Sequence, residues 1–211
     1  MSSHQHALTI SRHSALQGTL QVPGDKSISH RCLIFGALAQ GTSHFEGLSQ
    51  GEDVKSTQRC LAQLGVHFEN YGVPESKTLG LKVNGVGLQG LQAASEPLDC
   101  GNSGTTFRLL MGVLAAQPFS SQLTGDASLQ RRPMTRVSTP LSQLGAQFQL
   151  TNTHYAPLTI QATAPISHPL QGGNHTLEVA SAQVKSALLL AGLYTQEAMT
   201  LDGKIQSRDH T

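Results

Sequence analysis

The segment Leu20-Gln21-Val22-Pro23-Gly24-Asp25-Lys26-Ser27-Ile28-Ser29-His30-Arg31 sets the organisation of this chain. An extended run over 19–22 meets Pro23-Gly24, which ends a strand and forces a turn. From Ile28 onward, apolar residues recur at helical spacing and predict a helix over 28–40, closed by Gly41. The segment therefore reads as a strand, a turn and a helix in succession.

Three polar side chains gather at this turn. Lys26 and Ser27 stand at or just before the predicted helix N-terminus, and Arg31 follows one turn later. Backbone N–H groups, the positive end of the helix dipole, an ammonium, a hydroxyl and a guanidinium would then face one spot. This combination predicts a site for a phosphate or a carboxylate. The alternative is an ordinary Ser27 N-cap beside two solvated cations.

Composition narrows the class of protein. The 211 residues suffice for one large domain or two small ones with a buried core. Hydrophobic residues make up 38% and charged residues 13%, with 21 glycines, which is typical of a soluble, turn-rich protein and not of a disordered one. A net charge of +1 and 4% aromatic residues argue against a nucleic-acid partner.

Cysteine usage and apolar runs indicate a cytoplasmic protein without a membrane partner. The three cysteines (Cys32, Cys60 and Cys100) lie far apart, and an odd number favours reduced thiols. The N-terminus has no apolar signal region, and the longest apolar run, 187–193, is too short to span a bilayer. Ten histidines are scattered without metal-ligand spacing, so we interpret them as surface or incidental residues and expect no metal.

The order of predicted elements repeats along the chain. A short strand at 7–12 comes first. The first unit then has the extended run 19–22, helices 28–40 and 52–64, and strands 42–47, 66–71 and 79–84. The second has the extended run 97–100, helices 105–116 and 133–144 with Pro133 at the first helical position, and strands 121–125, 146–151 and 158–162. The third has strands 176–180 and 198–202 around helix 183–194.

The spacing of the glycines that end three of these strands supports a true repeat. Gly47, Gly125 and Gly203 stand at intervals of 78 residues. We therefore predict an α/β fold of repeated βαβαββ units, two complete and a third truncated, at about 19–90, 91–165 and 166–211. If the units pack with approximate threefold symmetry, the N-termini of their first helices converge on one face.

Two further segments stand where the repeat places helix starts, and a third lies in a nearby loop. These are Asn102-Ser103-Gly104-Thr105-Thr106, Ser181-Ala182-Gln183 and the loop Arg131-Arg132-Pro133. Glycines let backbone N–H groups approach a ligand closely. Each has an ordinary alternative: a capped helix start, an N-cap on a core helix, and an exposed cationic pair. Lys185 and Ser186 lie on the helix itself and need not share a site.

Taken together and in this order, five motifs resemble the 5-enolpyruvylshikimate-3-phosphate (EPSP) synthase family. They are Pro23–Arg31, Gly101–Thr105, Arg131–Met134, Ser181–Ala187 and Ser207–Thr211. The resemblance covers the whole chain but about the first half of the family's usual length. It implies an inverted α/β barrel fold, in which two domains of three units close on the substrates. Residues 1–18, with the first strand, would belong with the second domain, and 19–211 would form the N-terminal substrate-binding domain.

The same resemblance implies roles for individual residues, without a cofactor. Lys26 would be catalytic and touch both substrates. Shikimate-3-phosphate would be held by Lys26, Ser27, Arg31, Ser181, Ala182, Gln183 and Arg208. Phosphoenolpyruvate would be held by Lys26, Asn102, Gly104, Arg132 and Gln183. The enolpyruvyl group would pass to the 5-hydroxyl of shikimate-3-phosphate through a tetrahedral intermediate that loses phosphate, with charge stabilisation and positioning contributing most.

The resemblance also implies that this chain holds half of an active site. The family's acid and base carboxylates lie in the second domain, so we expect the chain alone to be inactive and the whole protein to be monomeric. Apolar surface left open by the truncated unit predicts marginal stability or self-association. A small residue at 104 implies inhibition by glyphosate. The alternatives are UDP-N-acetylglucosamine enolpyruvyl transferase, which has Asn where Ser27 stands, and a non-catalytic anion-binding domain.

Overall fold

The computed structural model describes residues 15, 17–20, 22–73, 79–162, 170–178 and 180–203. The strand predicted at 7–12, the candidate residue Arg208 and the end of the third unit lie outside the described residues. No helix in the described ranges is long and apolar enough to cross a membrane.

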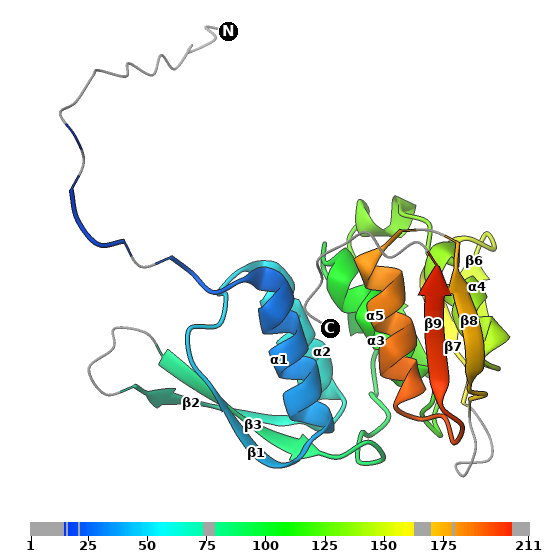
Figure 1. Ribbon diagram of the computed structural model, residues 1–211, viewed down its shortest axis with the longest axis horizontal. Coiled ribbons are helices and arrows are strands. Elements are labelled where there is room, and N and C mark those ends of the chain that lie inside the picture. The colour runs from blue at the N-terminus through cyan, green and yellow to red at the C-terminus, as the bar shows by residue number, and fades with distance from the viewer. Residues whose placement is uncertain are drawn as a thin grey trace, which may run out of the picture.

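The first unit is a three-stranded antiparallel sheet with two helices on one face (Figure 1). Its elements are α1 (Lys26–Leu38), β1 (Gln40–Phe45), α2 (Glu52–Gln63), β2 (His67–Gly72) and β3 (Leu79–Val86). The strand order is β1-β3-β2, and Phe45 of β1 faces Leu81 of β3. The buried side of α2 carries Val54, Thr57, Cys60 and Leu61, at the three- and four-residue spacing of an amphipathic helix.

The extended run expected at 19–22 is not a strand in its described residues. Leu20 is 85% exposed and Val22 is 72% exposed, so neither side chain packs against the sheet. An isolated strand segment gains neither ladder hydrogen bonds nor apolar burial, which explains why it does not form here. Within the described residues, the first unit therefore begins with α1.

The second unit forms a four-stranded mixed sheet, and the third repeats its first half. The second unit contains β4 (Leu98–Asp99), α3 (Gly104–Leu114), β5 (Ser121–Thr124), the 3₁₀ turn η1 (Leu129–Arg131), α4 (Thr135–Gln143), β6 (Phe148–Thr151) and β7 (Tyr155–Ile160), and its strand order is β4-β5-β7-β6. The third contains β8 (Gly173–Leu177), α5 (Ala182–Gly192) and β9 (Met199–Gly203). Both β4–β5 and β8–β9 are joined by one helix, in the strand–helix–strand order that the repeat predicted, and the strands of each pair are parallel. The strand predicted at 176–180 lies three residues earlier.

Two helix starts differ from the prediction. The N-cap of α1 is Asp25, whose Oδ1 accepts a hydrogen bond from the Ile28 N–H at 2.8 Å, so Lys26 and Ser27 already belong to the helix. Ser27 is therefore not a cap. Helix α4 begins at Thr135 and not at Pro133, because the Met134 N–H donates to the His154 carbonyl at 2.8 Å and holds the chain against the β6–β7 turn.

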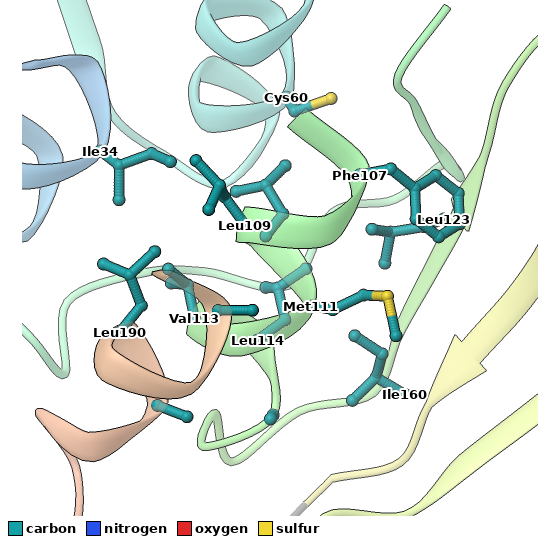
Figure 2. Packing of buried hydrophobic residues seen from close by; sticks show 14 of the residues in the cluster. Ile34, Cys60, Phe107, Leu109, Met111, Val113, Leu114, Leu123, Ile160 and Leu190 are labelled. Atoms are coloured by element: carbon teal, nitrogen blue, oxygen red, sulfur yellow. The ribbon is translucent and has the colours of Figure 1, made fainter. Parts of the chain in front are cut away.

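Helix α3 lies in the middle of the core (Figure 2). Its side chains Phe107, Leu110 and Met111 are fully buried. A Cβ at Gly112 would collide with the carbonyl of Ala187, so the backbones of α3 and α5 approach as closely as a glycine allows. This close packing brings the N-termini of the two helices together.

Candidate functional site

The turn before α3 is held by its own side chains. The N-cap Ser103 accepts a hydrogen bond from the Thr106 N–H at 3.1 Å. The Asn102 amide donates to Asp126 Oδ2 at 2.6 Å and accepts from Arg132 Nη2 at 2.8 Å. The hydrogen bond from Asn102 is the main cause that lowers the pKa of Asp126. Asn102 therefore fixes Arg132 beside the start of the helix.

Two guanidinium groups flank the buried Gly104. A Cβ at this position would lie 2.9 Å from Arg108 Nη1 and 3.3 Å from Arg132 Nη1. In the described parts of the chain, neither arginine has a carboxylate within ion-pair distance. Burial lowers the pKa of Arg108, and the charges of Arg132 and Arg136 act in the same direction. Clustered cations with no ion-pair partner among the described residues, next to a helix N-terminus, form a site for an anion.

Arg108 was missed by the sequence analysis. Its signal was its spacing, because a residue four positions after Gly104 lies on the same side of the helix. Its position also depends on α5, since Arg108 Nη1 donates to Gln183 Oε1 at 2.6 Å. Contacts of this kind cannot be derived from the spacing within one helix.

The first turn of α5 adjoins the first turn of α3. Gln183 Nε2 donates to Thr105 Oγ1 at 3.0 Å, so this side chain bonds to both Arg108 and Thr105. Ser181 caps α5 and accepts from the Val184 N–H at 3.4 Å, and Ala182 is the first helical residue. The structure therefore brings the segment Ser181–Gln183 to the same place as Gly104 and Arg132.

Lys26 and Arg31 lie on the α1 side and both have protein partners, unlike the two solvated cations of the alternative interpretation. Lys26 Nζ lies 2.9 Å from Asp53 Oδ2 in the first turn of α2. Arg31 is only 8% exposed, and it donates to the Ser27 carbonyl at 3.1 Å and to Ser186 Oγ of α5 at 2.5 Å. The sequence did not require Ser186 to belong to the site, but Ser186 contacts Arg31, which is one of the predicted site residues.

The two sides of this region are joined by a hydrogen bond. Thr106 Oγ1 of α3 donates to the Asp53 carbonyl of α2 at 3.1 Å. Helices α1 and α5 run in the same sense, with both N-termini at the upper end of the view in Figure 1. The described candidate residues therefore lie at the N-terminal ends of α1, α3 and α5 and in the loop that carries Arg132.

One histidine is neither exposed nor incidental. His30 is fully buried in α1, and its Nδ1 lies 2.6 Å from Thr57 Oγ1. The interpretation of His30 as a surface or incidental residue was wrong, because the helical face that carries it packs against α2. Among the described residues, no group of three His, Cys, Asp or Glu side chains could hold a metal ion.

A separate cavity of about 590 Å³ lies in the first unit, and none of the candidate residues lines it. Its lining includes Leu33, Val54, Leu81, Gln58 and Asn70. This cavity therefore does not coincide with the cluster of cations.

Known proteins resemble this chain along nearly its whole length. The family model of EPSP synthase (3-phosphoshikimate 1-carboxyvinyltransferase) matches residues 10–211. A 3-phosphoshikimate 1-carboxyvinyltransferase of Herpetosiphon aurantiacus is 52% identical over 204 residues, which cover 96% of this chain and 45% of the relative. One from Xanthomonas campestris pv. campestris is 48% identical, covering 100% of this chain and 46% of the relative.

Solved structures agree with the sequence relatives. The EPSP synthase from Acinetobacter baumannii superimposes with a TM-score of 0.82 at 43% identity, over 92% of this chain and 42% of that one. The chain thus spans less than half the length of these relatives. Matching sequence, fold and motif order together show that the chain belongs to the EPSP synthase family.

Proposed function

We propose that this chain provides one substrate-binding face of an EPSP synthase. The complete enzyme would transfer the enolpyruvyl group of phosphoenolpyruvate to the 5-hydroxyl of shikimate-3-phosphate and release phosphate. The observation that carries the proposal is the pair Arg108 and Arg132, which flank the buried Gly104 with no carboxylate in ion-pair distance among the described residues. Both substrates are polyanions, and such a cluster suits them.

The phosphoenolpyruvate subsite would lie around Gly104. Arg132, oriented by Asn102, would bind an anionic group of the substrate through two N–H donors. Gln183 would add an amide donor from α5. The absence of a Cβ at Gly104 leaves room beside the guanidinium groups. Lys26, held at the entrance by Asp53, would act as the catalytic cation next to the reacting carbon.

The shikimate-3-phosphate subsite would lie between α1 and α5. Arg31 spans these helices through Ser27 and Ser186, so its guanidinium lies between the two segments assigned to this substrate. Ser181, the backbone near Ala182 and Gln183 would meet the substrate from the α5 side. We assign Arg208 to the same phosphate on the basis of the family motif alone.

The catalytic contribution of this chain would be positioning and charge stabilisation. Proton transfer would use carboxylates from the part of the longer relatives that this chain does not cover, so the chain alone would not turn over. No cofactor or metal is required for the steps assigned to these residues. The complete protein would act as a cytoplasmic monomer, and residues 1–18 would belong with its second domain.

Titration calorimetry tests the proposal directly. We expect saturable binding of shikimate-3-phosphate and phosphoenolpyruvate to the chain, and roughly tenfold or greater weakening for phosphoenolpyruvate in Arg132→Ala, because a charge-assisted hydrogen bond is lost. The matched control is Arg59→Ala, an exposed α2 arginine that lies 3.6 Å from Glu52. Equal weakening in both variants would mean that binding follows net charge only.

An activity assay of the chain alone tests the assignment of the acid and base groups. The chain should release no phosphate from the two substrates by itself. Phosphate release at an enzymatic rate would contradict the assignment of these groups to the part of the longer relatives that this chain does not cover. A lack of anion binding in a folded protein would contradict the assignment of both subsites.

A further inference from the structure

Four buried side chains on α1, α2 and the start of α3 form one hydrogen-bonded chain. His30 Nδ1 lies 2.6 Å from Thr57 Oγ1, which lies 2.7 Å from Thr106 Oγ1. Thr106 Oγ1 in turn lies 2.7 Å from Ser103 Oγ. All four side chains belong to residues that are fully buried. None of them is among the residues assigned to the substrates.

Thr106 is the member that contacts both sides of the anion site. Its hydroxyl donates to the carbonyl of Asp53, whose carboxylate holds Lys26. Its backbone N–H donates to Ser103 Oγ, the N-cap between Asn102 and Gly104. One hydroxyl therefore connects the segment that carries the Lys26 pair with the turn that carries the Arg132 pocket.

One arrangement of donors accounts for the contacts that run from His30 to the Asp53 carbonyl. His30 Nδ1–H donates to Thr57, the Thr57 hydroxyl donates to Thr106, and the Thr106 hydroxyl donates to the Asp53 carbonyl. The same Thr106 hydroxyl also faces Ser103 Oγ, which shares its hydrogen with the Asp53 carbonyl. Linked buried hydrogen bonds strengthen one another and hold these side chains in place, while His30 Nε2, which is also buried, has no partner among the described residues. Burial lowers the pKa of His30 to about 4, so the neutral ring that this arrangement requires is the form present near pH 7.

We infer that Thr106 is a positioning residue, whose hydroxyl sets the distance between the Lys26–Asp53 pair and the Asn102–Arg132 turn. This inference rests on the proposed function, since it concerns the geometry of the phosphoenolpyruvate subsite. Cations on opposite sides of one small anion bind it well only at a fixed separation, because misplacement of about an ångström weakens binding and catalysis strongly.

The test compares Thr106→Val with Thr106→Ser in the full chain. Valine keeps the branched shape without the hydroxyl, and serine keeps the hydroxyl. Amide hydrogen exchange without ligand is measured at Val54 and Lys55, whose N–H groups donate to the Gly51 carbonyl at 3.0 and 3.2 Å in the first turn of α2. Interior amides of α5 serve as the reference for global opening.

We expect Thr106→Val to speed exchange at Val54 and Lys55 roughly tenfold relative to the α5 reference, as a local opening in the adjacent helix. It should also raise the Kd for phosphoenolpyruvate roughly tenfold, while Thr106→Ser stays within about twofold of the parent protein. If Thr106 had a merely structural role, Thr106→Val would lower the melting temperature and leave both the exchange ratio and the Kd unchanged. That result would overturn the inference.

The exchange measurement separates this inference from the proposed function, and a second variant covers the case in which the first does not fold. If the parent chain binds no phosphoenolpyruvate, the subsite assignment fails, and the exchange ratio still decides whether Thr106 couples α3 to α2. If Thr106→Val does not fold, Thr106→Ala takes its place, because it removes the same hydroxyl with a smaller side chain. An exchange ratio in that variant equal to the parent's would overturn the inference.

Discussion

The guanidinium of Arg31 in α1 donates a hydrogen bond to the hydroxyl of Ser186 in α5, 155 positions further along the chain. The same guanidinium donates to the Ser27 carbonyl, one turn earlier in its own helix. Arg31 is 8% exposed, so this charge connects the first and third units in a largely dry environment. Hydrogen bonds to a charged group are stronger in such an environment. When one of them is removed, the buried group that remains is unpaired, and this costs free energy of folding.

Removal of the Ser186 hydroxyl should therefore destabilise the fold. We expect Ser186→Ala to lower the free energy of unfolding by about 1–3 kcal/mol, the usual contribution of a hydrogen bond to a buried charge. Urea denaturation measures the change. Ser142→Ala, at an exposed position near the end of α4, is the matched control and should stay within about 0.5 kcal/mol of the parent protein. Equal losses in both variants would show that the contact with Arg31 adds nothing.

His30 should make the protein less stable in acid. Its pKa is lowered from 6.5 to about 4, mainly by burial and also by Lys26 and Arg31, against the opposing effect of Asp53. Below pH 6.5 the unfolded chain binds a proton that the folded chain does not accept until near pH 4. The contribution of the neutral His30 ring to the free energy of unfolding is therefore fully present above pH 6.5. It decreases by about 3 kcal/mol as the pH falls to 4.

The variant His30→Asn isolates this contribution, since an amide can replace the hydrogen bond of Nδ1 without titrating. The measurement is the free energy of unfolding at several pH values between 7 and 4 in both proteins. The difference between them should change by about 3 kcal/mol over this range. A constant difference would show that folding does not lower the pKa of His30.

The close approach of α3 and α5 should tolerate no side chain at position 112. A methyl group on Gly112 would collide with the carbonyl of Ala187, and backbone atoms cannot move aside cheaply. We expect Gly112→Ala to lower the free energy of unfolding by at least about 2 kcal/mol. Gly72→Ala is the control, because a Cβ there meets nothing within 4 Å. A fully stable Gly112→Ala protein would mean that the helices can separate without loss.

The order of elements could be predicted from the sequence because glycines recur where strands of the repeat end. Gly47 follows β1 and Gly203 ends β9 with φ of +67° and +112°, a region that favours glycine, whereas Gly125 has no positive φ and a Cβ there would instead meet Leu129 and the Gly101 carbonyl. Helix α2 was predicted at 52–64 and is found at Glu52–Gln63. The prediction was close because Gly65, with φ of +93°, and the helical spacing of the apolar residues both mark the same segment. Local signals of this kind depend only on neighbouring residues.

Contacts between units could not be predicted in the same way. The partners of Arg31, Arg108 and His30 lie on other helices, and no spacing within one helix identifies them. Pro133 failed as a helix start for a similar reason, since a hydrogen bond from Met134 to the His154 carbonyl sets the boundary. The order of the motifs was enough to locate the candidate site. The hydrogen-bond partners of its side chains depend on how the helices pack against one another.

Gly104 gives the sharpest test of the phosphoenolpyruvate subsite. Glyphosate is a small anion, and we expect a full-length enzyme that carries this half to be inhibited by it. A methyl group at position 104 would lie 2.9 Å from Arg108 Nη1 and 3.3 Å from Arg132 Nη1, so both guanidinium groups would have to shift. Gly104→Ala should therefore raise the inhibition constant by roughly tenfold or more, and the KM for phosphoenolpyruvate by less, because the chain between carboxylate and phosphorus is one atom longer in glyphosate than in phosphoenolpyruvate. Steady-state inhibition kinetics of the two full-length proteins measure both constants. An inhibition constant unchanged by the substitution would place glyphosate, and with it the proposed subsite, away from Gly104.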